Sequence, residues 1–386
     1  MTKQAFLEEL NRRAGGLSEA ERARLVDYYR EMIEDRVEEG IPEEEAVAAL
    51  GDPAALAEEL AGAAPKAAPE AGGETVSALS SLRVQVANAD VVVVREALEN
   101  GAACQLRFSD PSRFEWRMDG DTLEVREIKL EGGHRGLEYG LRWLRQLITE
   151  PELKVTIALS GGLAEALDFE GGGSDLRIDG AAFAKARLVT ASGDITLRDV
   201  NCAGGIGIDI HTHSGDVKLE GVHSANLIAH AASGDIFARS LALTGRLRLE
   251  SASGDIQLRA SEGDALSITT ASGDIEADRC RFGAAAVRAA SGDVRLVELE
   301  SDPTLAVDTA SGDVELCRCI AREARINTAS GDVDLRLEPL PCGYDLTSNT
   351  VSGSVHFDDA ALRGAGGLQP KIGVRTVSGD IEARLA

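Results

Sequence analysis

Three histidines in the second half of the chain have the spacing of a metal site. His211 and His213 are two residues apart, so on a β-strand both side chains would project from the same face. His211 and His230 each lie three residues before a Ser-Gly-Asp tripeptide, so stacked repeats would place their imidazoles on adjacent strands. Imidazole nitrogen is a ligand for zinc and other transition metals. The pattern predicts a metal site at His211, His213 and His230; an outer face of ordinary polar residues is the alternative.

The Ser-Gly-Asp tripeptide itself supplies a carboxylate once per repeat. Stacked carboxylates could chelate calcium, as in β-rolls whose nine-residue repeats supply several oxygens per turn. Here a single Asp recurs, mostly every 19 or 20 residues, and this favours a turn. In such a turn Gly supplies a backbone conformation that other residues resist, while Ser and Asp bond nearby amides. We accordingly predict no resident cofactor. Representative turn-forming residues are Ser192, Gly193, Asp194, Ser233, Gly234, Asp235, Ser272, Gly273, Asp274, Ser311, Gly312 and Asp313.

Catalytic chemistry is not indicated by the sequence. Enzymatic β-helices carry clustered acids and bases beside long loops, whereas the repeats here are nearly uniform. The exceptions are three expanded corners between consecutive repeats, at 201–207, 338–344 and 359–371, which are rich in Gly, Pro or Ala. None of them combines a nucleophile with a base. The sequence therefore predicts a protein that is not an enzyme.

The repeat that positions these residues also predicts the fold. The tripeptide begins at Ser192, Ser214, Ser233, Ser253, Ser272, Ser291, Ser311, Ser330 and Ser378, with a Ser-Gly-Ser variant at Ser352. An Ile or Val follows each Asp, and apolar and polar residues then alternate, which is typical of a half-buried strand. A fixed period of this size is typical of a solenoid. We predict a mainly β protein: a parallel β-solenoid of about eleven 19–20-residue coils with a β-rich N-terminal cap, preceded by a small all-α bundle.

Composition divides the chain into four parts. Residues 1–61 have the periodicity of an acidic helical bundle, and residues 62–75 form a flexible Ala/Pro/Gly linker. Residues 76–160 are β-rich without the repeat, which suits the shielding end of a solenoid. Residues 161–386 carry the repeat and stop directly after the last strand, which would leave a bare strand edge. We predict an end-to-end homodimer through this C-terminal coil, or cover by the 359–371 loop.

Charge and cysteine content narrow the possible partners and location. The net charge of −25 argues against direct nucleic-acid binding, which needs a positive surface. The six cysteines lack paired Cys-x-x-Cys motifs, which indicates small buried residues in a reducing compartment. The N-terminus is too charged for a signal peptide, and the sequence contains no apolar run of about 18 residues. We therefore expect a cytoplasmic protein without a membrane span.

Two resemblances to known families cover nearly the whole chain. Residues 1–61 resemble the HTH-associated α-helical signalling (HAAS) domain, DUF1700, and the residues that carry the resemblance are FLEEL from Phe6, YYREMI from Tyr28 and EEEAVAALGDP from Glu43. Residues 80–386 resemble the bacterial "putative adhesin" β-solenoid family, DUF4097, through the repeated TASGDI and the final TVSGDI from Thr376.

These resemblances imply a signalling or scaffold function. HAAS domains commonly accompany PadR-type transcriptional regulators and often precede membrane helices, whereas here the linker leads straight into the solenoid. The helical part would bind a protein partner, with a PadR-type regulator as the implied one, through Tyr28, Tyr29, Glu43 and Glu44. The solenoid would serve as a rigid interaction surface. An adhesin-like cell-envelope protein is the alternative, and it would require export.

Overall fold

The computed structural model describes residues 2–13, 22, 26, 29–30, 33–34, 36–37, 42–48, 50, 52–53, 74–128, 153–161, 164–358 and 369–386. The chain divides into two compact units, one containing the N-terminal helices and the other containing the strands. No helix within the described ranges is long and apolar enough to cross a lipid bilayer.

The helical unit contains helix α1 (Lys3–Arg13) and the short helix α3 (Glu43–Ala48). Apolar residues three and four positions apart place Phe6 and Leu10 on one face of α1, and both are fully buried. The Phe6 ring meets the buried Tyr29 ring edge-on, with 5.8 Å between the ring centroids. The small helical part predicted at the N-terminus is confirmed.

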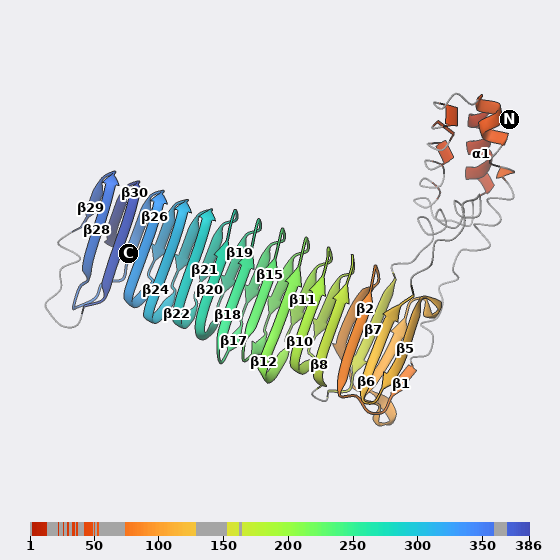
Figure 1. The fold of residues 1–386 in the computed structure, drawn as a ribbon, viewed down its shortest axis with the longest axis horizontal. Coiled ribbons are helices and arrows are strands. Elements are labelled where there is room, and N and C mark those ends of the chain that lie inside the picture. Colours follow the sequence, from red (N-terminus) through yellow and green to blue (C-terminus); the bar gives the residue numbers. More distant parts are fainter. Residues whose placement is uncertain are drawn as a thin grey trace. The chain divides into compact units, whose positions relative to one another are not determined.

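Two long sheets form the second unit (Figure 1). Sheet A has fifteen strands, which follow one another across the sheet as β1 (Glu74–Val76), β4 (Cys104–Phe108), β7 (Lys154–Leu159), β3 (Asp90–Arg95), β9 (Leu176–Asp179), β11 (Ile195–Arg198), β13 (Val217–Glu220), β16 (Ile236–Arg239), β19 (Ile256–Arg259), β21 (Ile275–Asp278), β23 (Val294–Val297), β25 (Val314–Cys317), β27 (Val333–Leu337), β31 (Ile381–Leu385) and β29 (Val355–Phe357).

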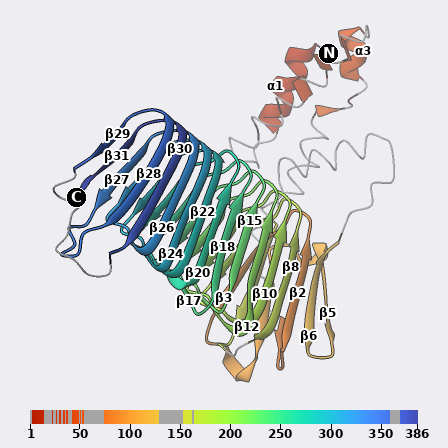
Figure 2. The same ribbon diagram turned by 60° about the vertical axis from the view of Figure 1, so that its left-hand side comes forward.

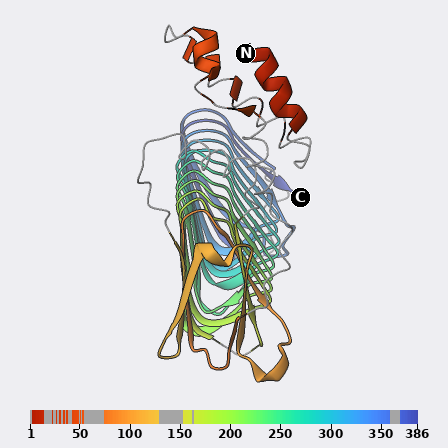
Figure 3. The ribbon, with the colours of Figure 1, turned by 90° about the vertical axis from the view of Figure 1, so that its right-hand side faces the viewer.

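Sheet B has sixteen strands. From the same end of the unit, the first six are β5 (Phe114–Asp119), β6 (Thr122–Glu127), β2 (Ser81–Val86), β8 (Ala164–Gly171), β10 (Ala182–Thr190) and β12 (Asn201–Thr212). Beyond β12 the next two coils each contribute two short strands: β14 (His223–Ser224) and β15 (Leu227–Ala231) both pair with β12, and β17 (Ala242–Leu243) and β18 (Arg246–Ser251) follow them and pair with β20 (Glu262–Thr270). The last five strands after β20 are β22 (Arg281–Ser291), β24 (Glu300–Ser311), β26 (Ile320–Ser330), β30 (Lys371–Ser378) and β28 (Asp345–Ser352). Viewed along the stack, the coils superpose as two facing layers (Figure 3). The predicted parallel β-solenoid is confirmed.

The core lies between the two sheets and is built from ladders of like side chains. In one coil, Leu247 and Leu249 of β18 and Ile256 and Leu258 of β19 point inward and are at most 1% exposed. The next coil repeats the pattern one strand spacing away, because the strands pair in parallel and in register. Complete burial of a Leu or Ile side chain stabilises a fold by about 1.5–3 kcal/mol. The period-two alternation of the sequence is therefore sufficient to define the inner faces.

The eight sheet A strands from β9 to β25 are each followed by a tight corner with a left-handed backbone. Gly180 and Gly221 occupy this corner with φ of 67° and 64°. Six other coils hold the same conformation without glycine, at φ between 48° and 56°: Asp199, Ser240, Ala260, Arg279, Glu298 and Arg318. A left-handed conformation costs an L-residue roughly 1–2 kcal/mol, so these corners store strain. The sequence did not predict this row, because glycine occupies only two of its positions.

Ala260→Gly is expected to stabilise the solenoid by about 0.5–1 kcal/mol, because glycine relieves the left-handed strain at the cost of some unfolded-state entropy. Ala260 is exposed, so little apolar burial is lost with its methyl group. Urea denaturation followed by far-UV circular dichroism would measure the change. Ala271→Gly is the matched control, since Ala271 is exposed and has no positive φ. It should destabilise slightly, and equal effects of the two variants would contradict the strain argument.

The N-terminal end of the stack is closed by antiparallel strands. In sheet A, β4 runs antiparallel to β7 and β1 runs antiparallel to β4; in sheet B, β5 runs antiparallel to β6. The outermost strand β5 exposes Glu115, Arg117 and Asp119. Charged residues on an edge strand oppose pairing with another chain. This end is therefore protected.

Glu127, the last residue of β6, accepts hydrogen bonds from the backbone of the turn between β2 and β3. Its Oε2 atom accepts the N–H groups of Ala87, Asn88 and Ala89 at 2.7, 2.8 and 3.2 Å. Its Oε1 atom lies 3.6 Å from Nη2 of Arg113, and the two side chains are only 3% and 11% exposed. A single buried carboxylate therefore holds three turn amides and one guanidinium.

The C-terminal end of the stack differs from the sequence-based expectation. Strands β30 and β31 are last in sequence, but they lie between the coil of β26 and β27 and the coil of β28 and β29 (Figures 1 and 2). The expectation that the final strand leaves the bare edge is wrong, and the outer coil is 345–357. Within the 359–371 loop proposed as cover, residues 359–368 lie outside the described residues.

Candidate functional site

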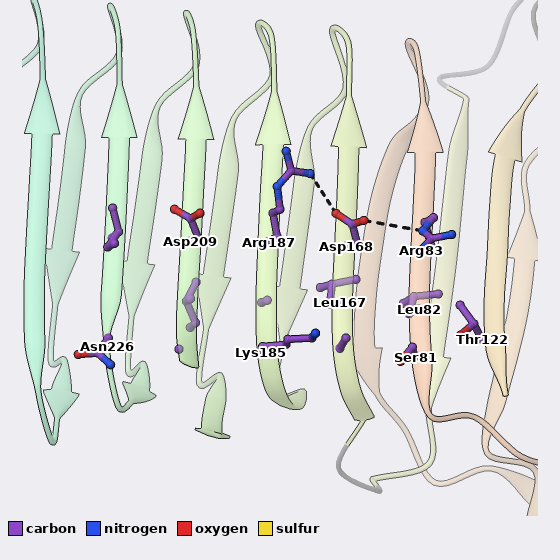
Figure 4. Close-up of a pocket in the computed structure, with 15 residues that line it drawn as sticks. Ser81, Leu82, Arg83, Thr122, Leu167, Asp168, Lys185, Arg187, Asp209 and Asn226 are labelled. Atoms are coloured by element: carbon purple, nitrogen blue, oxygen red, sulfur yellow. Dashed lines mark hydrogen bonds and ion pairs between the residues drawn. The ribbon is translucent and has the colours of Figure 1, made fainter. Parts of the chain in front are cut away.

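A groove of about 550 Å³, lined by charged and apolar residues, crosses the outer face of sheet B near its N-terminal end (Figure 4). It exists because one row of outward positions carries small residues. Ser81, Ala166 and Gly207 share this row with Lys185, since Ser81 pairs with Ala166, and Lys185 pairs with both Ala166 and Gly207. Among the described residues, no carboxylate forms an ion pair with Lys185. The groove therefore has a low floor with one cationic side chain on it.

The next outward row forms a charged wall. Arg83 Nε lies 3.7 Å and Arg187 Nη1 lies 3.2 Å from the two carboxylate oxygens of Asp168 (Figure 4). Arg187 also bonds Glu170 at 3.1 Å, and this bond, followed by one from Gln85, holds the pKa of Glu170 below its ordinary value. The wall is a network of alternating charges held in place by strand register.

One end of the groove is shaped by a close backbone contact. Gly207 has a φ of 94°, and a Cβ on it would lie 2.1 Å from the carbonyl oxygen of Asn226. The Asn226 side chain is fixed because its Oδ1 accepts the Arg246 N–H at 3.0 Å. Asp209 and the half-exposed Ile228 continue the wall beyond this point. The arrangement presents hydrogen-bond donors and acceptors beside apolar surface, so it can contact a ligand that carries both kinds of group.

The histidines continue the wall by one further outward position. His211 and His230 are paired across β12 and β15, with 5.8 Å between their ring centroids. Nε2 of His211 lies 3.0 Å from Oδ1 of Asp209, which also lines the groove. His213 is exposed and follows the last residue of β12. Among the described residues, no three His, Cys, Asp or Glu side chains gather as a metal cluster. The structure brings two histidines together, and metal binding stays a prediction.

The Ser-Gly-Asp turns are joined by a ladder of carboxylate bonds. Asp194 N–H donates to Oδ1 of Asp175 at 2.8 Å, and Asp216 N–H donates to Oδ1 of Asp194 at 2.9 Å. The same bond recurs coil by coil until Ser354 N–H donates to Oδ1 of Asp380 at 2.7 Å. The Ser354 amide bond, followed by one from its hydroxyl, lowers the pKa of Asp380. The ladder explains the Ser-Gly-Ser variant. Ser354 lies in the outermost coil, so no further coil donates an amide hydrogen bond to a carboxylate at this position.

Two details of these turns differ from the sequence-based expectation: why glycine is required, and which hydroxyl accepts the turn amide. A Cβ on Gly193, Gly234 or Gly273 would lie 1.8 to 2.0 Å from a carbonyl oxygen of the preceding coil, so lack of space excludes other residues. Gly312 also has a φ of 150°. In the turn of Gly273 the N–H donates to Oγ1 of Thr270 at 3.0 Å, so the bonding hydroxyl belongs to the Thr two residues before the Ser.

The buried cysteines are poor candidates for chemistry. Burial raises the pKa of Cys104 to about 12 and that of Cys280 to about 11. A nucleophilic or metal-binding cysteine needs a thiolate, which such a pKa disfavours.

The predicted partner-binding residues of the helical unit separate into two groups. Tyr29 is 4% exposed and packs on Phe6, so its side chain belongs to the core. Glu43 and Glu44 are exposed at the start of α3, and Oε1 of Glu43 accepts the Lys3 N–H at 2.9 Å. Tyr28 lies outside the described residues.

Comparison with known families agrees with this architecture. The Toastrack DUF4097 model matches twice, over residues 119–240 and 225–384, and so covers more than half of the chain. The chain belongs to the Toastrack DUF4097 family. The HAAS model matches residues 5–59 of this Toastrack protein, so both resemblances seen in the sequence are confirmed. A HAAS domain joined to a Toastrack solenoid indicates a signalling or binding protein.

Solved structures resemble the Toastrack protein weakly. A crystal structure of a protein described as a "putative lipid binding protein" from Parabacteroides distasonis is 13% identical, with a TM-score of 0.33, over 81% of this chain and 98% of its own. A "putative cell adhesion protein" from Clostridium sporogenes covers the same shares at 7% identity and a TM-score of 0.18. A search among curated proteins found no match.

Sequence reasoning missed the groove and Glu127. The groove depends on residues of β2, β8, β10 and β12 that meet only through strand pairing. One signal was present, because the corner at 201–207 interrupts the regular repeat and its last residue, Gly207, lines the groove. Glu127 lies outside the repeat and gave no signal.

Proposed function

We propose that this Toastrack protein is a cytoplasmic, non-catalytic signalling protein that binds a PadR-type transcriptional regulator through its HAAS domain. The observation that carries the proposal is the union of a HAAS domain and a Toastrack solenoid in one chain. HAAS domains generally take part in protein–protein interactions. In this proposal residues 62–75 connect the two parts as a flexible linker.

Charge complementarity supports this partner. The first turn of α3 consists of Glu43, Glu44 and Glu45, all exposed. A transcriptional regulator needs a positive surface for DNA phosphates. An acidic surface steers such a partner and fixes its orientation. Glu44 is the better residue to substitute, because Glu43 accepts a hydrogen bond from the backbone of Lys3 and its loss would also disturb the helical unit.

The solenoid contributes a pre-organised surface in the same proposal. The groove lies on paired strands, and its wall is fixed by the Arg83–Asp168–Arg187 network. A site held rigidly before binding loses less entropy when a ligand arrives. We propose this groove as the place where the solenoid meets a polar ligand or a polar segment of a partner.

The partner proposal is tested by measuring binding of the full chain to the PadR-type regulator encoded in the same genome. Biolayer interferometry of wild type should show saturable binding. Glu44→Lys should weaken it by about 5–10-fold, as expected for a charge at an interface rim. Glu262→Lys is the control, because Glu262 is exposed on the solenoid and the variant changes net charge equally. Absence of binding by wild type, or equal losses in both variants, would refute the proposal.

The location is tested separately with protease added to intact cells. A cytoplasmic protein should stay whole until the cells are lysed. Digestion from outside would support the adhesin-like alternative instead.

A further inference from the structure

We propose that two copies of this chain join tail to tail through the outer coil formed by β28 and β29. This goes beyond the proposed function, since it concerns the far end of the solenoid and a second copy rather than the HAAS partner. It also changes the surface that the sequence suggested, because the outer coil is 345–357 and not the C-terminal one.

The outer coil leaves both its backbone and its core open. Within the described residues, β28 pairs only with β30, and β29 pairs only with β31. Val355 is 40% exposed, whereas Ile381, its partner one coil inward, is 1% exposed. Val351, the next-to-last residue of β28, is 80% exposed, compared with 55% for Val377 at the same outward position of the inner coil. Unpaired N–H and C=O groups beside exposed apolar side chains form a template for another strand.

The same coil lacks the charges that protect an edge strand. Across β28 and β29 the sole carboxylate is Asp345, at the far end of β28 from the turn. The inner coils carry an Asp at the third turn position, but the outer coil carries Ser354 there. When β28 pairs antiparallel with the β28 of the second copy, the turn of one copy lies beside the Asp345 end of the other. An Asp at position 354 would there face the Asp345 carboxylate, at an unfavourable electrostatic energy. The replacement by Ser removes this repulsion.

A second copy of the same end is the partner that fits. The N-terminal end of the stack presents antiparallel strands and the charged edge of β5, so head-to-tail growth is blocked. A two-fold axis perpendicular to the sheets would set β28 antiparallel to the β28 of the second copy. In this orientation all eight residues of β28 can pair with the eight of the second copy. Pairing β28 with the three-residue β29 would leave most of its backbone groups without a hydrogen bond. The contact is isologous and closes at two copies.

The size of the end surface suits a reversible dimer. A strand of eight residues spans about 26 Å, and two sheets about 10 Å apart with their side chains are about 20 Å thick. The contact would cover about 500 Å² on each copy, or about 1,000 Å² in total, the lower bound for a specific interface. We therefore expect dissociation in the micromolar range.

Sedimentation velocity of the full chain between about 1 and 100 µM tests the proposal. Wild type should shift from monomer to dimer across this range. The double variant Val351→Lys, Val355→Lys should stay monomeric, with a dissociation constant at least tenfold higher, because each copy then brings two charges to an edge that must lose water to pair. Both side chains are exposed in the single chain, and circular dichroism would verify that the variant folds.

Ile320→Lys is the control, since Ile320 is 49% exposed on β26 and does not belong to the outer coil. It should dimerise like wild type. Monomeric wild type throughout the range would overturn the proposal, and so would a double variant that dimerises as well as wild type, because the contact would then lie elsewhere. None of these outcomes depends on the HAAS partner.

Discussion

Glu127→Ala is expected to lower the free energy of unfolding by about 3–5 kcal/mol, the range found when one partner of a buried ion pair is removed. The variant leaves the N–H groups of Ala87, Asn88 and Ala89 without their acceptor and the Arg113 guanidinium without its carboxylate. The bonds of Ala87 and Ala89 are partly buried, and an unsatisfied buried polar group costs about 1–3 kcal/mol. Denaturation by urea would measure the loss, and hydrogen exchange at residues 87–89 would locate it.

The controls separate this carboxylate from charge in general. Glu115→Ala removes an exposed carboxylate from the neighbouring strand β5, and its effect should stay within about 0.5 kcal/mol. Glu127→Gln keeps one oxygen acceptor, so it should cost less than Glu127→Ala. If Glu127→Ala and Glu115→Ala had equal effects, Glu127 would not hold the turn between β2 and β3.

The periodic part of the fold was predictable because local and global signals coincide there. Ile256 and Leu258 alternate with polar residues, and the same alternation returns in each repeat at the same distance from a turn. A strand with one apolar face must bury it, and equal spacing lets identical faces stack. The number of sheets and the order of the coils did not follow from this pattern, because it assigns a face to each residue but no neighbour to each strand.

The order of the coils at the C-terminal end is decided by small differences between similar strands. Ser348 of β28 lies opposite Val374 of β30, so the more apolar strand takes the inner place, where its side chain is 1% exposed. Ser354 stands where the inner coils have Asp, because a carboxylate at this position would have no amide N–H to accept a hydrogen bond from. The sequence contained this signal as a Ser-Gly-Ser variant, but its meaning depends on the ladder of bonds between coils.

The candidate site was less predictable than the fold, because pairing rather than proximity in sequence builds it. Ser81 of β2 and Ala166 of β8 are adjacent only after the coil of β2 and β3 has inserted next to β8 and β9. Outward positions tolerate many side chains, so a row of small residues there has no periodic signature. The histidine pair was predictable, since both residues have the same distance from their turns.

Gly273→Ala is expected to cause a loss of more than about 4 kcal/mol of stability, or failure to fold. The added Cβ would lie 2.0 Å from the Gly254 carbonyl oxygen, a backbone atom held on both sides by paired strands. Adjacent strands are held about 4.8 Å apart by their hydrogen bonds, so the methyl group can enter only if the coils separate. Thermal and urea denaturation of the purified variant would measure the loss.

Two further glycines make the test specific to stacking. Gly205→Ala adds the same methyl group with no atom within 4 Å, so its stability should stay within about 0.5 kcal/mol of wild type. Gly353→Ala brings a Cβ to 2.1 Å from the Gly379 carbonyl oxygen, but Gly353 lies in the outer coil, which can lift away alone. Its damage should be confined to residues 345–357 in hydrogen exchange, whereas Gly273→Ala should raise exchange on both sides of its turn. Equal damage from Gly273 and Gly205 would mean that backbone flexibility, and not the close approach of the coils, accounts for glycine at every turn.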